Sequence, residues 1–433
     1  MMSDASLARD WAGWLVLVLS FLAIALVREA RRNGRVARAL FVVLALHHLV
    51  ALTNAYLLTT PGADADAQTF QRMASEIAQG EEERTIGTGA HVYRLLLASV
   101  YRVFGVSHLL GEELSILAFL ASCAVLLRTL HLLGLSERAP ALLLLFGALP
   151  SMVFFGSVTL REPWQILFLV AAIHAALRYQ RRHRAVDLTK FAIFAVGMGM
   201  FHDALLIYAA FLVGALAVLA MPGVGGSLYG LARRAAVAVA LVGVLVSGMA
   251  LLASTAGEGR VSWLFTTVFK GDAVERLQEY REGGIRVAEE AEARTTYGIT
   301  FDSTSWQTMV ATTLPAFVLY MWAPFPWQIT NALDVYAVAE TAWRTLLLIA
   351  ALVTWRRASG AERRFYGFLL LTYVSMAAFW SLGTVNFGTA IRHHTLSYPI
   401  LVLMGAPRVL EAWRSALTAL TARAERLTGV RAG

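Results

Sequence analysis

Apolar residues run continuously along this chain for about 17–25 positions at a time, and short polar stretches separate the runs. A run of about 20 apolar residues is the length that a helix needs to cross a bilayer. Strands of a membrane barrel would instead alternate apolar and polar positions. The pattern therefore predicts helical spans at 11–27, 39–58, 110–132, 138–158, 163–178, 189–221, 235–254, 308–327, 338–355, 366–382 and 395–410.

Two of these segments do not fit one straight crossing. Residues 189–221 are too long, and His202-Asp203 interrupts them, which predicts two short spans with that polar pair at the turn. Residues 308–327 contain Pro315, and the basic residues after the next span require this segment to enter the membrane and return. We expect an all-α polytopic membrane protein of about 11–13 transmembrane or re-entrant helices, with residues 1–433 as a single integral membrane domain.

Arginine is concentrated in short segments between spans, and this bias predicts the topology. The basic stretches at 28–38 and 178–184 are expected in the cytoplasm. The two longest loops, 59–107 and 255–306, carry more acid than base and would then lie on the outer face. The basic amphipathic tail, 411–433, is expected on the anionic inner surface of the membrane.

The composition supports the same class of protein. Of the 433 residues, 58% are hydrophobic and 15% are charged, which is too little charge to cover a soluble protein of this length. The net charge of +8 comes largely from topology-setting loops, so it does not indicate a nucleic-acid partner. Cys123 is the only cysteine and lies in an apolar run, which excludes a disulfide framework and a cysteine metal site.

The first outer loop contains two stretches with helical spacing of apolar residues. These residues are Phe70, Met73, Ala74 and Ile77 in one stretch and Leu97, Val100, Tyr101 and Phe104 in the other. Glycines at 80, 87 and 89 separate them. Both stretches are therefore predicted to be amphipathic helices in the headgroup layer.

The predicted topology brings charged and polar residues from distant parts of the chain to the outer face. They are Asp64, Asp66, His91, Tyr93, Arg94, Arg161, Glu162, His202, Asp203, Arg392, His393 and His394. Arginine binds phosphate through parallel hydrogen bonds and keeps its charge, while a carboxylate or histidine can take a proton from a hydroxyl. These residue types suit a transfer reaction on a phosphate-bearing substrate.

Structural roles compete with that reading at each position. Arg161 and Glu162 could form a mutually neutralised ion pair at a helix end, and Asp64 and Asp66 could cap a helix over about 66–79. His202-Asp203 could serve only to break a helix, and residues 392–394 could form a basic cluster facing headgroups. No HExxH, P-loop or GxSxG pattern occurs, so nucleotide hydrolysis and serine chemistry lack support.

Several short segments resemble polyprenyl-phosphate-sugar-dependent membrane glycosyltransferases of the GT-C class. Asp66-xxx-Phe70-xxx-Ala74 and the tyrosine-containing stretch from Gly89 to Ser107 are similar to the first outer loop of those enzymes. The segments Leu160–Pro163, Ala323–Trp327 and Gly388–His394 resemble members from polysaccharide gene clusters, some of them called repeat-unit (O-antigen-type) polymerases. The chain departs from the usual pattern by an extra span before the loop and by Arg392-His393-His394.

The resemblance implies roles for the outer-face residues. Asp66, with Asp64 as its rival, would be the catalytic base on the acceptor hydroxyl, and His393 and His394 are further catalytic candidates. Arg161 and Arg392 would hold the lipid-linked phosphate, and Glu162 would orient Arg161 or bind acceptor or metal. The remaining candidates for substrate binding are His91, Tyr93, Arg94, His202 and Asp203.

The leading hypothesis is a glycosyltransferase of the bacterial inner membrane with its active site facing the periplasm or exterior. Its donor would be a sugar or oligosaccharide on a polyprenyl phosphate or diphosphate, and its acceptor a glycan or a lipid-linked glycan. No cofactor is assigned, and a divalent cation, Mg²⁺ or Mn²⁺, is left open. Membrane lipid and envelope-assembly proteins are the other expected partners. A repeat-unit polymerase is the closest alternative, and a lipid-linked glycan transporter or flippase and a scaffold subunit are the competing classes.

Overall fold

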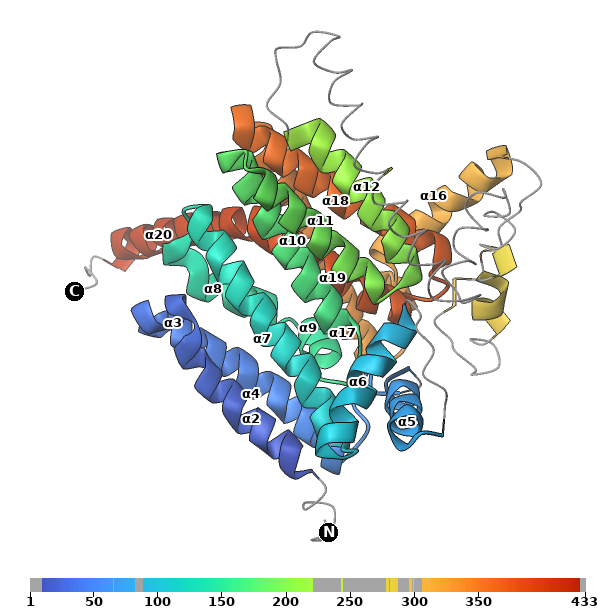
Figure 1. Ribbon diagram of the computed structural model, residues 1–433. Helices are drawn as coiled ribbons and strands as arrows, with labels where there is room; N and C mark the ends of the chain where they lie inside the picture. The colour runs from blue at the N-terminus through green and yellow to red at the C-terminus, as the bar shows by residue number, and fades with distance from the viewer. Residues whose placement is uncertain are drawn as a thin grey trace.

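The computed structural model describes residues 10–64, 66–81, 89–220 and 306–428, together with 243, 278, 279, 281–286, 296, 297 and 299. Helices dominate these residues, and an isolated antiparallel bridge joins Thr296 to Asn386 (Figure 1). Four described helices are long and apolar enough to cross a membrane, or five if one bent pair counts as a single span. The all-α membrane class is therefore confirmed, whereas the finer expectation of about 11–13 spans remains a prediction.

The N-terminal helices pack into one group with a polar interior. They are α2 (Trp11–Ala23), η1 (Ile24–Leu26), α3 (Arg28–Arg32), α4 (Gly34–Tyr56) and α7 (His108–Leu132). Asn33 and Ser107 cap α4 and α7, because each side chain accepts a hydrogen bond from a backbone N–H of the first turn. Cys123 is buried in α7. His47 and His48 are also buried.

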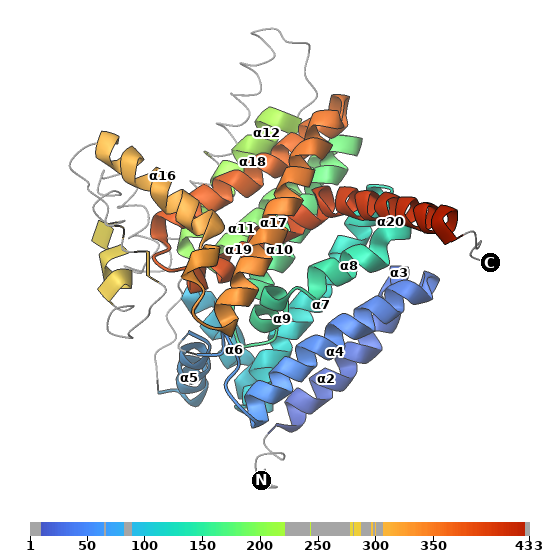
Figure 2. The same cartoon turned by 180° about the vertical axis from the view of Figure 1, so that it is seen from behind.

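Two amphipathic helices occupy the region predicted as the first outer loop. These helices are α5 (Asp66–Gln79) and α6 (Ala90–Phe104), and they pack against each other. Their buried apolar residues, among them Phe70, Ile77, Leu97 and Tyr101, form a hydrophobic cluster of their own with Leu110 and Val158. Phe104 is exposed, although its spacing places it with the apolar face. Figures 1 and 2 show both helices at one end of the molecule.

The segment predicted as one span over 138–158 is not a straight helix. After η2 (Ser136–Arg138), α8 (Ala139–Gly147) and α9 (Pro150–Gly156) are separate helices, and the pair is bent by 67°. Leu149 is extended because the ring of Pro150 clashes with a helical residue before it. Residues 157–161 then run without helix to the start of α10.

The break predicted inside 189–221 is present. Helix α10 (Glu162–Arg182) leads into α11 (Ala185–Met200) and then α12 (Asp203–Ala220), and the turn between the last two contains His202. Ion pairing between Arg178 Nε and Asp187 Oδ1, 2.9 Å apart, joins α10 to α11. The predicted span 235–254 and most of the predicted loop 255–306 lie outside the described residues.

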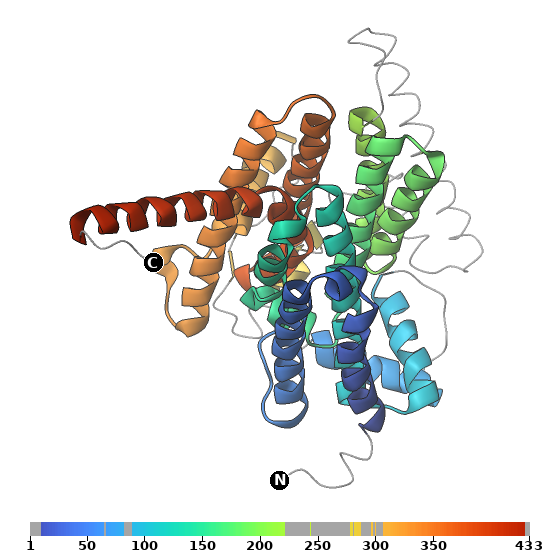
Figure 3. The same cartoon turned by 90° about the vertical axis from the view of Figure 1, so that its left-hand side faces the viewer.

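The C-terminal helices complete the bundle. They are α16 (Trp306–Trp322), η3 (Pro326–Gln328), α17 (Ala332–Arg357), α18 (Gly360–Gly383), α19 (Phe387–Met404) and α20 (Ala406–Thr428). Helix α16 continues through Pro315 and is a single helix, whereas the sequence suggested a segment that enters and returns. Helix α20 extends away from the bundle (Figure 3) and carries exposed Trp413, Leu417 and Leu420.

Candidate functional site

Arg392 joins two carboxylates that come from distant parts of the chain. Its Nη1 lies 2.5 Å from Asp66 Oδ2, and its Nε and Nη2 each lie 2.7 Å from Glu162 Oε1. The three residues belong to α5, α10 and α19. A guanidinium has donors on two edges, so a single arginine can bind two carboxylates at once. The structure thus brings together one proposed base and one proposed phosphate-binding residue.

Local structure places each member of this cluster at a helix end. Glu162 is the first residue of α10, where Pro163 fits the first turn and a negative charge is favoured by the helix dipole. Asp66 is likewise the first residue of its helix, α5. Arg392 lies in the second turn of α19, whose start is fixed by a hydrogen bond of 2.8 Å from Thr389 N to Asn386 Oδ1.

The two carboxylates differ in their contact with solvent. The Asp66 side chain is 59% exposed, whereas that of Glu162 is 4% exposed. Partial burial opposes ionisation of Asp66, but the charges of Arg392 and, further away, Arg161 outweigh it and lower the pKa of this carboxyl. Asp66 is therefore ionised at neutral pH and accessible, as a group that meets an acceptor hydroxyl must be.

Arg161 lies next to this cluster, close enough for its charge to act on Asp66. Glu162 forms an ion pair with Arg392, which lies on a different helix. The guanidinium carbon of Arg161 lies 5.8 Å from the ring centroid of Phe70 on α5, a cation–π distance. Phe70 also packs edge-on against Tyr93, with ring centroids 5.1 Å apart.

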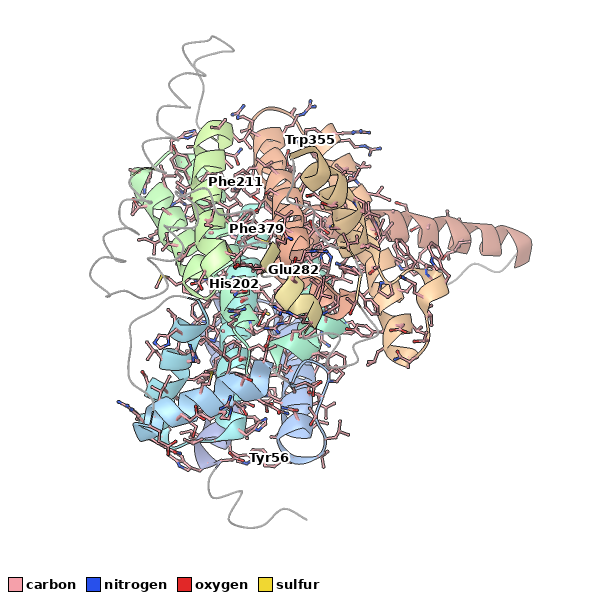
Figure 4. All side chains as sticks on the ribbon, turned by 90° about the vertical axis from the view of Figure 1, so that its right-hand side faces the viewer. Tyr56, His202, Phe211, Glu282, Trp355 and Phe379 are labelled. Carbon is pink, nitrogen blue, oxygen red and sulfur yellow. The ribbon has the colours of Figure 1, made fainter. Side chains whose placement is uncertain are left out.

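Two histidines contact Trp380 of α18 near the arginines. The His393 ring stacks on Trp380 at 3.9 Å, and the His202 ring meets Trp380 edge-on at 4.8 Å. Burial lowers the pKa of His202 well below its usual value, and the charges of Arg161, His393 and Arg392 lower it further, so this imidazole is neutral at pH 7. Figure 4 shows His202 between Tyr56 near one end of the molecule and Trp355 near the other.

Asp203 lies beside the start of α6. A Cβ on Gly89 would come within 2.7 Å of the Asp203 carboxylate oxygens, and Gly89 has a positive φ of 68°. Gly89 N also donates to Met200 O at 2.9 Å. Glycine is required at this close approach of α6 to the α11–α12 turn. The turn therefore helps to position α6 next to the cluster.

The other predicted residues lie on α6 or just before α5. His91, Tyr93 and Arg94 are buried where α6 packs on its neighbours. The Tyr93 hydroxyl is 3.4 Å from Ser115 Oγ, and Arg94 Nη1 is 3.2 Å from Met73 Sδ. Asp64 is exposed, and its backbone carbonyl accepts a hydrogen bond from Ala67 N.

His394 faces a different part of the bundle from His393. Its Nε2 is 2.9 Å from Tyr320 O, and the two rings lie 4.3 Å apart. Successive helical residues are turned by about 100°, and here this turn directs the two adjacent histidines to different neighbours. His393, whose Nδ1 is 3.1 Å from Thr384 Oγ1, is the one beside the Arg392 cluster.

Inside the predicted spans 110–132 and 338–355, the sequence-based candidates left out four buried charged residues. Glu112 and Glu113 lie in α7, and Glu340 and Arg344 lie in α17, all of them 5% exposed or less. Charges inside predicted spans are rare and mark functional or structural polar networks, so their positions within 110–132 and 338–355 carried the signal. The candidate residues were charges at the ends of spans, and these four lie inside spans.

Comparisons with protein-family models, curated proteins and solved structures found no match to this chain. The resemblance to GT-C glycosyltransferases therefore stays a prediction from short motifs. Within the part of the chain that the structure describes, no three His, Cys, Asp or Glu side chains are grouped so that they could hold a metal ion. The described residues thus provide no ligand set for the divalent cation that the sequence left open.

Proposed function

We propose that this protein is a glycosyltransferase of the bacterial inner membrane, with its active site facing the periplasm or exterior. It would transfer a sugar or oligosaccharide from a polyprenyl phosphate or diphosphate in cell-envelope or exopolysaccharide synthesis. The observation that supports this proposal is the cluster of Asp66, Glu162 and Arg392, beside which Arg161 lies. An exposed ionised carboxylate next to two arginines combines a proton acceptor with groups that bind phosphate.

In the proposed reaction, an acceptor hydroxyl attacks the anomeric carbon of the donor sugar. The new bond forms between the hydroxyl oxygen and that carbon, and the bond from the carbon to the phosphate oxygen breaks. Asp66 takes the proton of the hydroxyl, and the lipid phosphate leaves with the bonding electrons. Arginines fixed before the reaction stabilise the charge that grows on the leaving oxygen.

Arg392 has to change partners for this reaction to proceed. Its Nη1 binds Asp66, so a donor phosphate would displace that carboxylate while Glu162 keeps hold of the other edge of the guanidinium. Glu162 is the positioning residue in this scheme because it is buried and fixes Arg392. Binding of the donor would thus release Asp66 to meet the acceptor.

Transport of a lipid-linked glycan is the second candidate, and one observation favours it. A transporter needs polar groups within the depth of several spans. Glu113 with His48 in the N-terminal group, and Glu340 and Arg344 in α17, are such groups. They are separate from the Arg392 cluster, so the two candidates predict different sensitive residues.

Replacement of the cluster residues tests the transferase. Arg392→Ala, Arg161→Ala and Asp66→Asn should each reduce glycan assembly at least about 100-fold, because each removes a group from the transition state. The readout is the polymer and the lipid-linked intermediates that accumulate in a deletion strain carrying each variant. Short repeat units on lipid would indicate a polymerase, and a missing sugar would indicate single-residue transfer.

Arg72→Ala is the matched control, because Arg72 is an exposed arginine of α5 that pairs with Glu76 one turn away. It should leave assembly unchanged. All variants must insert at normal levels for the comparison to hold. Wild-type polymer from the three cluster variants would contradict the proposal, and loss confined to Glu113 or Glu340 variants would favour transport.

A further inference from the structure

The connection between α2 and α4 changes direction twice and has a recess beside it. Helix α2 ends at Ala23 and continues into η1, after which Val27 is extended. The short helix α3 follows, and Asn33 is extended again before α4 begins. The chain therefore does not pass from one helix to the other through a tight turn. The recess at this connection has a volume of about 510 Å³.

Apolar side chains make up most of the lining of this recess. They are Phe21, Ile24, Ala25, Ala30, Ala37 and Phe41. The rings of Phe21 and Phe41 lie 5.1 Å apart and form a continuous apolar wall. Phe41 is exposed, as is Leu26 of η1 nearby in the chain. Exposed apolar surface of this kind, on helices with the composition of membrane spans, fits contact with lipid chains.

Two arginines complete the lining, Arg31 of α3 and Arg38 of α4. Both side chains are exposed, and among the described residues neither guanidinium forms an ion pair or a hydrogen bond with the protein. Arg38 and Phe41 are three positions apart in one helix, so their side chains are neighbours. At 1.5 Å of rise for each residue, Arg38 lies about 4.5 Å closer to the start of α4 than Phe41 does. The charged part of the recess is therefore displaced along the helix from the apolar wall.

This arrangement complements a phospholipid with a net negative charge. Arginine binds phosphate through parallel hydrogen bonds, and an acyl chain needs an apolar surface that leads away from the phosphate. Residues 28–38 carry five arginines and one glutamate, and such a basic segment attracts anionic lipid at the cytoplasmic surface, where this segment is expected. The volume lies within the range of about 300–1,000 Å³ that is usual for ligand pockets.

We propose that the recess at α3 binds an anionic phospholipid of the inner leaflet. Arg31 and Arg38 would hold its phosphate, and one acyl chain would lie against Phe21 and Phe41. Figure 2 shows α3 away from α5, the helix that carries Asp66. The lipid site is therefore distinct from the proposed site of sugar transfer, and it is defined by binding alone.

Photocrosslinking of the full-length chain in detergent tests the site. The probe is phosphatidylglycerol with a photoactivatable diazirine in one acyl chain, and the labelled peptides are mapped. Phosphatidylglycerol and phosphatidylcholine with identical chains serve as unlabelled competitors. We expect labelling within residues 21–41, displaced by phosphatidylglycerol at a concentration at least about tenfold lower than by phosphatidylcholine. Equal displacement by the two lipids would overturn the proposal, and so would the absence of label from residues 21–41.

Two double variants test the arginines at equal net charge. Arg31→Gln with Arg38→Gln should weaken labelling of residues 21–41 at least about tenfold. Arg32→Gln with Arg35→Gln is the matched control, because it removes the same charge from the same segment at exposed positions outside the lining. It should label as the wild type does. An equal loss in both double variants would indicate general attraction to a basic segment and would overturn the site.

A substitution that fills the recess tests its apolar part with the arginines intact. Ala25 lines the recess and is exposed, so Ala25→Trp should weaken labelling at least threefold. Leu26→Trp is its control, since Leu26 is exposed outside the lining. If the double arginine variant does not insert, unchanged labelling of Ala25→Trp overturns the proposal. None of these measurements uses glycan transfer, so a negative result leaves the proposed function standing.

Discussion

At the scale of single residues, Arg392 is shared by two carboxylates whose surroundings differ. Glu162 is almost fully buried against it, and Asp66 reaches it from a partly exposed helix end. Pairs between exposed charges contribute about 0.2–1 kcal/mol, while hydrogen bonds to charged groups in buried positions contribute about 1.5–3 kcal/mol. The two carboxylates should therefore differ in structural importance even though they bind one arginine.

Comparison of Glu162→Gln with Asp66→Asn tests this difference. We expect Glu162→Gln to lower the free energy of unfolding by about 1.5–3 kcal/mol, because it leaves the buried edge of Arg392 without a counter-charge. Asp66→Asn should lower it by about 0.2–1 kcal/mol. Unfolding in detergent, followed by temperature or denaturant, measures both. Equal effects of the two substitutions would show that burial does not govern the strength of these pairs.

The Asp66–Arg392 pair also predicts an acid dependence of stability. The folded-state pKa of Asp66 is lower than its usual value of 3.8, so folding favours the ionised form. Its contribution is complete above that unfolded value and is lost as the pH falls through the lower folded value. The Tm difference between wild type and Asp66→Asn should thus be constant above about pH 5 and shrink below about pH 4. A difference that grows on acidification would contradict the lowered pKa.

At the scale of helices, the sequence predicted elements well where one local signal sets the boundary. Apolar spacing gave α5 and α6, and the polar pair at 202–203 gave the break between α11 and α12. The segment over 138–158 is bent, because the extended residue before Pro150 divides it into two helices, and no local pattern of apolar residues marked this bend. Pairing was the harder problem, since the partner of Glu162 lies 230 positions away and no local pattern encodes such a contact.

The buried polar network of the N-terminal helices shows the same limit. His48 Nδ1 is 2.9 Å from Glu113 Oε1, and His48 Nε2 is 2.8 Å from Ser20 Oγ, so three helices are tied together through one imidazole. Each residue alone looks like an exception inside an apolar run. Only the packing of α2, α4 and α7 makes them partners.

Removal of Glu113 should weaken this connection. Glu113→Ala leaves His48 buried without its carboxylate, so we expect a loss of about 1–3 kcal/mol in the free energy of unfolding. The matched control is Glu137→Ala, an exposed glutamate of η2 that should change stability by less than about 0.5 kcal/mol. Denaturant unfolding in detergent measures both. A Glu113→Ala protein as stable as the control would mean that water replaces the carboxylate.

At the scale of the whole molecule, features expected on the same side of the membrane lie together. Arg138 Nη1 is 2.7 Å from Glu411 Oε1, which joins the basic turn before α8 to the start of the tail. Asp66, Glu162 and Arg392 meet elsewhere, next to α5 and α6. Figures 1 and 2 show α3, α8 and α20 gathered away from α5 and α6. Helix ends that loop charge assigns to the same side of the membrane therefore lie near one another. Loop charge did not predict that α16 is a single helix.

Reporter fusions test this arrangement in a bacterial host. A fluorescent protein at the C-terminus should fluoresce, and alkaline phosphatase fused there should be inactive, because the tail is expected in the cytoplasm. Alkaline phosphatase inserted after Glu81 should be active. The opposite pattern at either position would contradict the proposed side of the membrane.

The burial of Cys123 in α7 has a practical consequence for following conformational change. Since it is the only cysteine of the chain, thiols introduced in pairs on α5 and α19 can be modified in an otherwise native protein. Spin labels at such a pair would report the separation of the two helices by dipolar spectroscopy. Lengthening of that separation on addition of a phosphate-bearing lipid would reveal Arg392 exchanging one carboxylate for its ligand.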